Sequence, residues 1–455
     1  MKRIAAFALA GLLASACAWA QGTDEPSQPP PPAAAPPAAA SVPLSSTAEA
    51  VYSDARPRLL QVRTLVQSAG GQATLGSAFL VSADGLALTN YHVVSQYALE
   101  PSTYRLEYLA PDGTSGPLKL YAIDVANDLA VVQLDRSSLP YFTFDERAVK
   151  GDLPKGERLF AMGNPLDLGF TIVEGTYNGL VDKSYNERIH FSGALNPGMS
   201  GGPTVTTGGR VAGVNVAKQI GGDLVSFLVP ARHAAALLAR ARTNGPMTPE
   251  SARAEIGHQL ASWQTALYAA LAARGFRTAT FGPYAVPESA ATWFSCWSRT
   301  NAGETPKPRA IADQTSCSTQ ASLFVAGDLD TGAIDLAHAY VRSVDLNAFQ
   351  FATFVSDLYR YEGFSGRRKR LTPARCQEDF VRADDPTARP MLRVVWCARA
   401  YRDFEGIYDV VVSAVTQDRA REALVSRLSM RGASWDNAQA LAREFLGSIG
   451  FASAP

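Results

Sequence analysis

Three side chains in the first half of the chain have the types that nucleophilic catalysis needs. His92 stands in TNYHVV, just after an expected strand, and Asp128 stands in ANDLAVVQL, just before one. Ser200 stands in the glycine-rich loop NPGMSGGP. A serine hydroxyl is a weak nucleophile at neutral pH, so a base must take its proton during the attack. Histidine suits this task because its unperturbed pKa lies near neutrality, and a carboxylate beside it fixes the imidazole tautomer.

The loop that carries Ser200 has the composition of an oxyanion site. Gly198 allows the backbone to fold so that the N–H groups of Gly198 and Ser200 point into one hole, where they would stabilise a tetrahedral oxyanion. Gly201 and Gly202 permit close packing where side chains would clash. The order His, Asp, Ser along the chain is that of chymotrypsin-like enzymes and differs from the subtilisin and hydrolase orders.

Short strands are the elements that must hold these residues in place. From about 57 to 230, segments rich in β-branched residues alternate with turn sequences such as ADG, PDGT and TTGG. Many short strands at this spacing favour a barrel or sandwich over an α/β fold. Helices are expected next, over 231–245 and 248–275, the second with Thr248 as N-cap and Gly275 as C-cap.

Residues 57–233 resemble the protease domain of the HtrA (Deg) family, within the trypsin-like superfamily. The resemblance rests on GSAFLVSADGLALTNYHVV, NDLAVVQL, FAMGNPLDLG, NPGMSGGP and GGRVAGVNVA, which occur in the family's order. It implies a double β-barrel with the site in the cleft between the barrels. It also implies that His92 is the general base, that Asp128 orients it and that Ser200 is the nucleophile, with Gly198 and Ser200 forming the oxyanion hole.

The resemblance further implies where a substrate would bind. Asn215, Val216 and Ala217 would form the strand edge that pairs with the substrate backbone. Ala194 and Leu195 would line the base of the specificity pocket. Neither is acidic, so we expect a neutral, small or medium apolar side chain at the cleaved position rather than Arg or Lys.

Two features depart from the family. Ser192 and Met199 stand where members commonly have Asp and Asn, at positions that border the pocket and the loop. The second feature is the back half of the chain. Members usually carry a PDZ domain after the protease, and we find no glycine-rich carboxylate-binding loop after residue 245.

The back half has its own composition. All five tryptophans beyond residue 20 lie after residue 245, and so do four of the five cysteines. An apolar stripe marks the helix over 248–275, formed by Ile256, Leu260, Trp263, Leu267 and Leu271. Residues 391–416 predict paired strands, and two closing helices are expected near 418–431 and 434–449.

These patterns divide the chain into four parts. Residues 1–20 are expected to be a signal peptide and 21–46 a disordered Pro- and Ala-rich linker. Residues 47–245 are expected to form an all-β, trypsin-like double β-barrel protease domain. Residues 246–455 are expected to form an α+β C-terminal domain.

Two processing routes fit the N-terminus. Lys2 and Arg3 precede an apolar run, and Ala18-Trp19-Ala20 has the small-x-small pattern of a signal peptidase site. In the second route LASAC is a lipoprotein site, and Cys17 anchors the chain to a membrane. The first route predicts a periplasmic or secreted protein. It removes two positive charges from a formal net charge of +0, which leaves −2.

The remaining cysteines, an even number in an exported chain, predict disulfides. Three connectivities are open, and pairing neighbours along the chain would join Cys296 to Cys317 and Cys376 to Cys397. Reduced thiols or a zinc site are the alternatives, but no C-x-x-C spacing supports zinc. We expect no metal or other cofactor, and structural roles for the remaining histidines, which are His190, His233, His258 and His338.

The balanced charge gives no electrostatic footprint for nucleic acid, so no nucleic-acid partner is expected. The basic run from Gly366 to Arg370 is either a solvated loop or an anion site. The function we expect is an exported serine endopeptidase acting on exposed or unfolded envelope polypeptides. Two alternatives are an envelope binding or sensing protein built on a narrow-specificity protease fold and a protease that processes only itself. An envelope partner of the C-terminal domain and a homo-oligomer are compatible with each.

Overall fold

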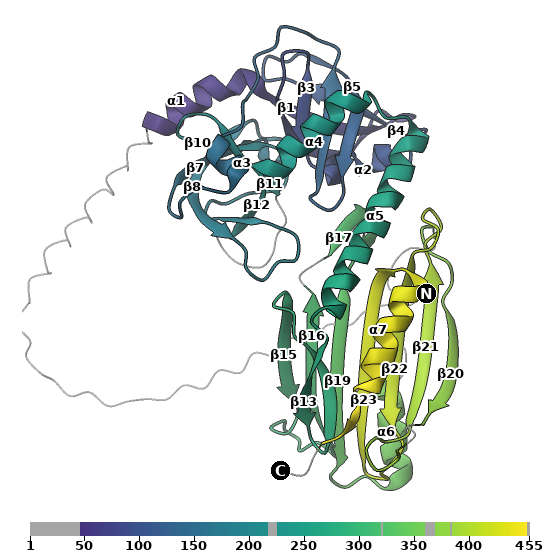
Figure 1. Ribbon diagram of the computed structural model, residues 1–455. Coiled ribbons are helices and arrows are strands. Elements are labelled where there is room, and N and C mark those ends of the chain that lie inside the picture. Colours follow the sequence, from purple (N-terminus) through teal and green to yellow (C-terminus); the bar gives the residue numbers. More distant parts are fainter. Residues whose placement is uncertain (1–45, 217–224, 320–321, 360–368, 383–384, 453–455) are drawn as a thin grey trace, which may run out of the picture. The chain divides into compact units, whose positions relative to one another are not determined.

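The computed structural model describes residues 46–216, 225–319, 322–359, 369–382 and 385–452 (Figure 1). The expected signal peptide, Cys17 and nearly all of the expected linker lie outside these ranges. Ser46, the last residue of that linker, begins helix α1 (Ser46–Ala55). Within the described residues no helix combines the length and apolar character needed to span a membrane.

Six antiparallel strands close into the first barrel, in the order β1-β2-β3-β6-β5-β4. Helix α2 (Tyr91–Leu99) follows β3 directly and is preceded by the extended residue Asn90, so His92 lies in its first turn. The strands are β1 (Leu59–Val66), β2 (Gln72–Leu80), β3 (Leu86–Thr89), β4 (Tyr104–Leu109), β5 (Ser115–Asp124) and β6 (Leu129–Leu134).

Six further strands close into a second barrel, in the order β10-β11-β12-β9-β8-β7. The predicted double barrel is therefore confirmed. Helices α3 (Glu146–Lys150) and α4 (Ala231–Asn244) flank this barrel, and α4 confirms the helix expected from residue 231. The strands are β7 (Arg158–Gly163), β8 (Thr171–Leu180), β9 (Ile189–Phe191), β10 (Pro203–Thr206), β11 (Val211–Val216) and β12 (Ser226–Pro230).

Helix α5 (Pro249–Ala272) begins as its sequence predicts. The Thr248 hydroxyl accepts from the Ser251 N–H, and the Ser251 hydroxyl accepts from the Thr248 N–H, which completes a capping box. All five residues of the predicted apolar stripe are buried. The predicted C-cap is wrong, because the helix is capped at Ala273. Gly275, with φ +63°, lies two residues further on in the left-handed region that favours glycine.

The C-terminal region is built on a seven-stranded antiparallel sheet, in the order β15-β16-β19-β23-β22-β21-β20 (Figure 1). Side chains alternate between its two faces, so one face packs on α5 and α7 (Trp435–Gly447) and the other on α6 (Ala348–Tyr359). The α+β prediction is confirmed. The strands are β15 (Phe294–Thr300), β16 (Ala310–Thr319), β19 (Ile334–Ser343), β20 (Arg375–Val381), β21 (Leu392–Ala400), β22 (Tyr408–Thr416) and β23 (Glu422–Ala433).

Two smaller sheets complete this region. β13 (Phe276–Phe281), β14 (Tyr284–Ser289) and β24 (Gly450–Phe451) form a three-stranded sheet. β17 (Leu323–Ala326) and β18 (Leu329–Thr331) form a separate hairpin in the segment of chain that connects β16 to β19.

One predicted helix is wrong. Residues 418–431 were expected to be helical, but Glu422–Ala433 is strand β23, paired with β19 on one side and β22 on the other. Leu424, Leu428 and Met430 are separated by even numbers of residues, so they lie on one face of the strand, where they are buried. Ladder bonds on both sides outweigh the helical propensity of the Ala, Leu and Arg residues here, which amounts to only tenths of a kcal/mol each. The helix expected over 434–449 is confirmed as α7, and β21 and β22 confirm the predicted strand pair.

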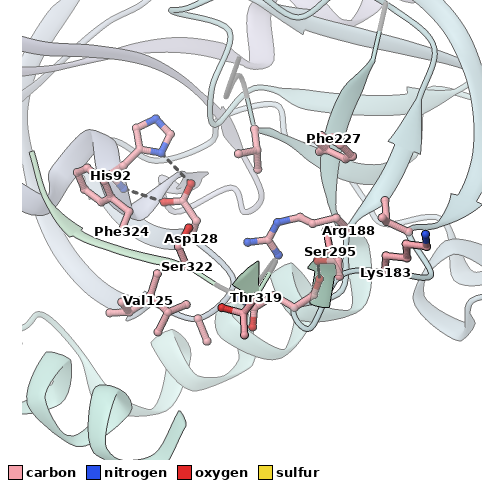
Figure 2. Close-up of a pocket in the computed structure, with 16 residues that line it drawn as sticks. His92, Val125, Asp128, Lys183, Arg188, Phe227, Ser295, Thr319, Ser322 and Phe324 are labelled. Carbon is pink, nitrogen blue, oxygen red and sulfur yellow. Dashed lines mark hydrogen bonds and ion pairs between the residues drawn. The ribbon is translucent and has the colours of Figure 1, made fainter. Parts of the chain in front are cut away.

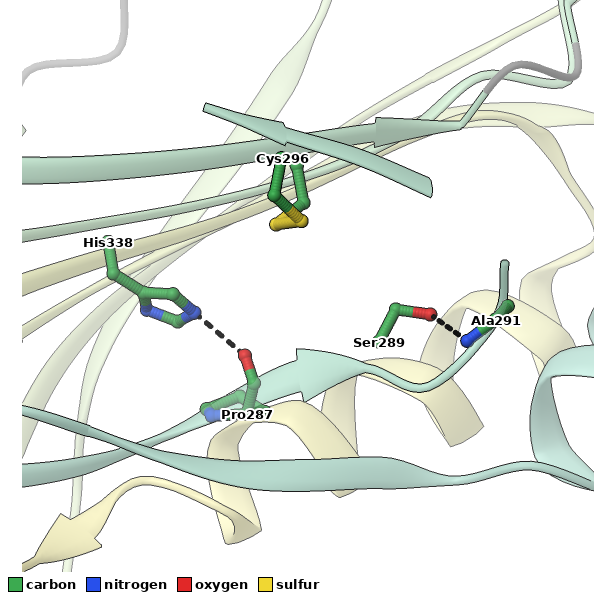
Figure 3. The surroundings of a disulfide bond; sticks show 6 residues. Pro287, Ser289, Ala291, Cys296 and His338 are labelled. Carbon is green, nitrogen blue, oxygen red and sulfur yellow. Dashed lines mark hydrogen bonds between the residues drawn. A yellow bond between two sulfur atoms is a disulfide. The ribbon is translucent and has the colours of Figure 1, made fainter. Parts of the chain in front are cut away.

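Both predicted disulfides are present and lie at opposite margins of the sheet. Figure 3 shows the surroundings of the bond formed by Cys296. Cys296 on β15 is directly opposite Cys317 on β16, and Cys376 on β20 is directly opposite Cys397 on β21. Each bond therefore joins an outermost strand to its neighbour. The neighbour-wise connectivity predicted from the sequence is confirmed.

The first barrel and the C-terminal region share one apolar core. The same buried cluster includes Val93 and Leu99 from α2 and Ile256 and Leu260 from α5. At its edge, the Gln259 side chain accepts from the Val125 N–H at 2.7 Å and donates to the Ile123 carbonyl at 2.8 Å. This continuous packing fixes the C-terminal region against the barrel, since an apolar interface opposes relative domain motion.

Candidate active site

His92 and Asp128 form a paired imidazole and carboxylate. The His92 Nδ1 lies 2.7 Å from Asp128 Oδ2, and the His92 backbone N–H donates to Asp128 Oδ1 at 2.9 Å. A carboxylate can only accept, so Nδ1 carries a proton, and in the neutral imidazole Nε2 keeps its lone pair. The imidazole side chain keeps about a quarter of its surface exposed and the carboxylate less. The pair can thus accept a proton at Nε2.

Asp128 is held in an uncommon backbone conformation. Its φ is +61°, in the left-handed region that few non-glycine residues adopt. The Asn90 side chain donates to the Asp128 carbonyl at 2.7 Å, and Asn90 itself is fully buried just before α2. Strained backbone persists only where its surroundings enforce it, so this brace sets where the carboxylate lies. Asn90 was not predicted from the sequence, although its place two residues before His92 in TNYHVV could have suggested it.

Ser200 lies on a tight turn between β9 and β10, and it is buried. Its carbonyl accepts from the Ser77 N–H at 2.7 Å, which ties the turn to β2. The Ser77 hydroxyl donates to the Gly198 carbonyl at 2.7 Å and accepts from the Asn164 N–H at 2.9 Å. Ser77 therefore joins the turn to the loop after β7. The sequence analysis did not single it out.

The turn has room only for glycine at Gly198. A Cβ there would lie 2.4 Å from the Asn164 carbonyl oxygen, and the φ of Gly198 is +97°. The Pro197 carbonyl accepts from the Leu166 N–H at 3.0 Å. Because C=O and N–H point in opposite directions across a trans peptide, the Gly198 N–H points away from Leu166.

Asn215 supports the turn from behind. It is fully buried, and its side-chain NH2 donates to the carbonyls of Met162 and Met199 at 2.8 and 3.2 Å. Its backbone N–H donates to the Gly202 carbonyl, and its carbonyl accepts from the Gly201 N–H. Asn215 thus positions the nucleophile turn, a role that the sequence analysis did not foresee. Val216 follows it on β11, and Ala217 lies outside the described residues.

The other predicted pocket residues lie around this turn. Ala194 is exposed, and the half-buried Leu195 has its N–H bonded to the Ser226 hydroxyl at 3.0 Å. The Ser192 hydroxyl accepts from the Thr176 N–H at 2.9 Å. Met199 is fully buried. At the two positions that depart from the family, the Ser192 hydroxyl is therefore bonded to β8 and the Met199 side chain is buried.

Comparison with known proteins gives this region its family. Residues 76–214 match the trypsin-like peptidase domain family. These residues form a trypsin-like peptidase domain. They run from β2 to β11 and contain the predicted catalytic residues. The resemblance seen in the sequence is therefore confirmed for this part of the chain.

The trypsin-like domain also carries the similarity to individual proteins. The chain is 32% identical over 185 residues to the probable periplasmic serine endoprotease DegP-like of Chlamydia pneumoniae, covering 39% of this chain and 36% of that protein. It is 34% identical over 164 residues to the probable periplasmic serine endoprotease DegP-like of Bartonella henselae, covering 34% of this chain and 31% of that protein. A solved HtrA-type protease with a tripeptide is 26% identical, with a TM-score of 0.38, covering 44% of this chain and 64% of that one. The chain thus spans about a third of the length of these curated relatives.

A pocket of about 460 Å³ opens beside His92 and Asp128 (Figure 2). The first barrel contributes Val125 and Ala126, and the second contributes residues between Val181 and Arg188 together with Val216 and Phe227. The C-terminal region completes the lining with Ser295, Thr319, Ser322, Leu323 and Phe324. The pocket therefore belongs to both halves of the chain, which the sequence did not indicate.

Among the remaining histidines, His338 lies in the interior of the C-terminal region. His338 is buried, and its Nδ1 lies 2.8 Å from the Ser426 hydroxyl. Its Nε2 lies 2.9 Å from the Pro287 carbonyl (Figure 3). Burial lowers its pKa to about 4, so it is neutral and donates to Pro287 from Nε2. Within the described ranges, no cluster of three or more His, Cys, Asp or Glu side chains could hold a metal ion.

The basic run of Gly366 to Arg370 is described only from Lys369 onward. Arg370 is buried and forms ion pairs with Glu100, Asp328 and Asp403. The solvated-loop interpretation is therefore wrong for Arg370, because its charge is already matched by three carboxylates.

Proposed function

We propose that this chain is an exported serine endopeptidase that cleaves exposed or unfolded polypeptides of the cell envelope. The observation that carries the proposal is the hydrogen-bonded pair of His92 and Asp128 on the first barrel of a trypsin-like double barrel. The glycine-rich turn that carries Ser200 is hydrogen-bonded to β2 of that first barrel. The names of the relatives support export to the periplasm. We further propose that residues 47–245 form the protease domain and that residues 246–455 form an α+β C-terminal domain packed against it.

The mechanism follows from the protonation of the pair. His92 Nε2 takes the proton from the Ser200 hydroxyl as its Oγ bonds to the substrate carbonyl carbon. Asp128 stabilises the imidazolium that forms. The N–H groups of Gly198 and Ser200 bind the oxyanion, each worth about 3 kcal/mol in such sites. His92 then gives its proton to the leaving amine as the C–N bond breaks, and water releases the acyl group by the reverse sequence.

Cleavage of casein tests the proposal. The wild-type protein should degrade casein, and Ser200→Ala should abolish the cleavage while leaving the melting temperature within a few degrees. Ser115→Ala, at an exposed serine of the same domain, is the matched control and should retain full activity. Equal activity in wild type and Ser200→Ala would contradict the assignment.

A further inference from the structure

The pocket beside His92 has one wall that the trypsin-like domain does not supply. Leu323 and Phe324, from hairpin strand β17, and Thr319, at the end of β16, line this wall. The Phe324 ring lies edge-on to the His92 ring, with centroids 6.0 Å apart. A segment of the C-terminal region therefore reaches the side chain that we propose as the general base.

The hairpin is fastened at both ends of α2. At the first turn, the Tyr91 hydroxyl donates to the Val325 carbonyl at 2.9 Å, and Tyr91 is completely buried. At the other end, the Arg370 guanidinium donates to Glu100, which caps α2, at 2.6 Å, and to Asp328, in the hairpin turn, at 3.4 Å. Phe324 is thus a fixed part of the pocket.

The opposite wall, the loop between β8 and β9, is also set by the C-terminal region. The Tyr185 ring contacts Trp263 and Trp293 edge-on, with centroids 5.5 and 5.3 Å apart. The Trp263 indole donates to the Asn186 side chain at 2.9 Å. These contacts determine where the loop places Arg188, which follows two residues later.

Arg188 brings a positive charge into the pocket. Its guanidinium extends between Asp128 and Thr319 (Figure 2) and donates to the Glu187 carbonyl at 2.8 Å. In the part of the chain that the structure describes, no carboxylate forms an ion pair with it. Lys183 adds a second cation to the lining. Asp128 is the one carboxylate among the lining residues, and it is already engaged by His92.

The surroundings of Arg188 make a ligand carboxylate favourable. Arg188 is half-buried, and burial lowers its pKa while the carboxylates of Asp128 and Asp124 oppose the shift. A partly buried guanidinium without an ion-pair partner is costly, and a bidentate carboxylate would satisfy it. The net positive lining contrasts with the balanced charge of the whole chain.

We propose that this pocket is a substrate subsite that takes an acidic side chain through Arg188, with Phe324 as the apolar wall that packs on the neighbouring substrate residue. The inference rests on the proposed endopeptidase function. Val216 lines the same pocket and belongs to the strand edge predicted to pair with substrate. The acidic residue is therefore expected in the substrate segment that pairs along this edge, while the cleaved position takes a neutral side chain.

A peptide library tests this subsite. Pooled synthetic decapeptides, with every residue type at each position, are cleaved by the full chain, and the products are sequenced by mass spectrometry. We expect Asp and Glu to be enriched at one position near the cut. A matched pair of fluorogenic peptides, one with Glu at that position and one with Gln, should then differ in kcat/KM by about 10-fold or more.

Variants assign the preference to Arg188. Arg188→Met should bring the Glu-to-Gln ratio of kcat/KM close to one, mainly because kcat/KM for the Glu peptide falls. Arg188→Glu should reverse the preference toward a Lys-containing peptide. The control is Arg210→Met, at an exposed arginine of the same barrel, which should keep the wild-type ratio.

The outcomes separate this inference from the function on which it rests. Cleavage that depends on Ser200 but shows no acidic preference, or a preference that Arg188→Met leaves intact, overturns the subsite. If no peptide is cleaved, anisotropy of the fluorescein-labelled Glu and Gln peptides on the Ser200→Ala chain provides the test. Tighter binding of the Glu peptide, lost in the Ser200→Ala, Arg188→Met double variant, then supports the subsite although the proposed activity fails. Equal binding of the two peptides overturns it.

Discussion

The Phe324 ring of the C-terminal hairpin lies 6.0 Å from the His92 imidazole, in an edge-to-face arrangement. The two residues belong to opposite halves of the chain, and the hairpin between β16 and β19 brings them together. The back half of the chain thus forms part of the candidate active site. Its tryptophans act at the same boundary, since Trp263 and Trp293 hold the loop that carries Arg188.

Removing the Phe324 ring should weaken substrate binding without unfolding the protein, because Phe324 is only half-buried. Phe324→Ala should lower kcat/KM for the best library peptide roughly tenfold, about 1.4 kcal/mol, mainly through a higher KM. Phe349→Ala, at a phenylalanine of α6 that is 87% exposed, is the control and should match wild type. Unchanged kinetics in Phe324→Ala would show that the hairpin wall does not contact substrate.

Arg370 should hold the hairpin against the C-terminal end of α2. Its side chain is 9% exposed and lies among three carboxylates, so Arg370→Met leaves them facing one another. We expect the free energy of unfolding to fall by about 3 kcal/mol in urea titration. Arg375→Met, on the exposed strand β20, should change it by less than about 0.5 kcal/mol. A similar small effect in Arg370→Met would contradict the clamp.

His338 should make the fold sensitive to acid. Its pKa is lowered to about 4 in the folded chain by burial, against 6.5 when exposed, so the unfolded state binds the proton first. The stability it contributes is complete above pH 6.5 and is lost as the pH falls toward 4. Between pH 7 and 5 the loss is about 2 kcal/mol.

The measurement is urea unfolding of wild type and His338→Gln at the two pH values. The difference between the two proteins should shrink by about that amount at pH 5. His258→Gln, at an exposed histidine of α5, should show the same change in unfolding free energy with pH as wild type. If the unfolding free energy of His338→Gln changed between the two pH values as much as that of wild type, His338 would not be held neutral in the folded chain.

The fold could be predicted where local pattern and tertiary environment agree. The pairing of His92 with Asp128, the N-cap of helix α5 and the two disulfides each depend on a short segment or on spacing. Strand β23 was missed because its pairing partners, β19 and β22, override its local propensity. Arg188 and Phe324 could not be predicted either, because nothing in their own segments shows which surface the hairpin contacts.

The disulfide between Cys376 and Cys397 should stabilise the outer margin of the sheet. Replacing both residues by Ser frees a loop of 21 residues and should cost about 3 kcal/mol of unfolding free energy. Dithiothreitol should then lower the melting temperature of wild type more than that of the double variant, which retains only the Cys296–Cys317 bond. Equal sensitivity to the reductant would indicate that the Cys376–Cys397 bond contributes nothing.

The central claim is that Ser200 is an activated nucleophile served by His92 and Asp128. The most direct measurement is reaction with a fluorophosphonate, in which a serine Oγ–P bond forms as fluoride leaves, followed by peptide mass spectrometry of the labelled chain. We predict a single adduct on Ser200, at least about 100-fold slower in Asp128→Asn because the imidazole tautomer is no longer fixed. An adduct on another serine, or no adduct on a folded chain, would contradict the claim.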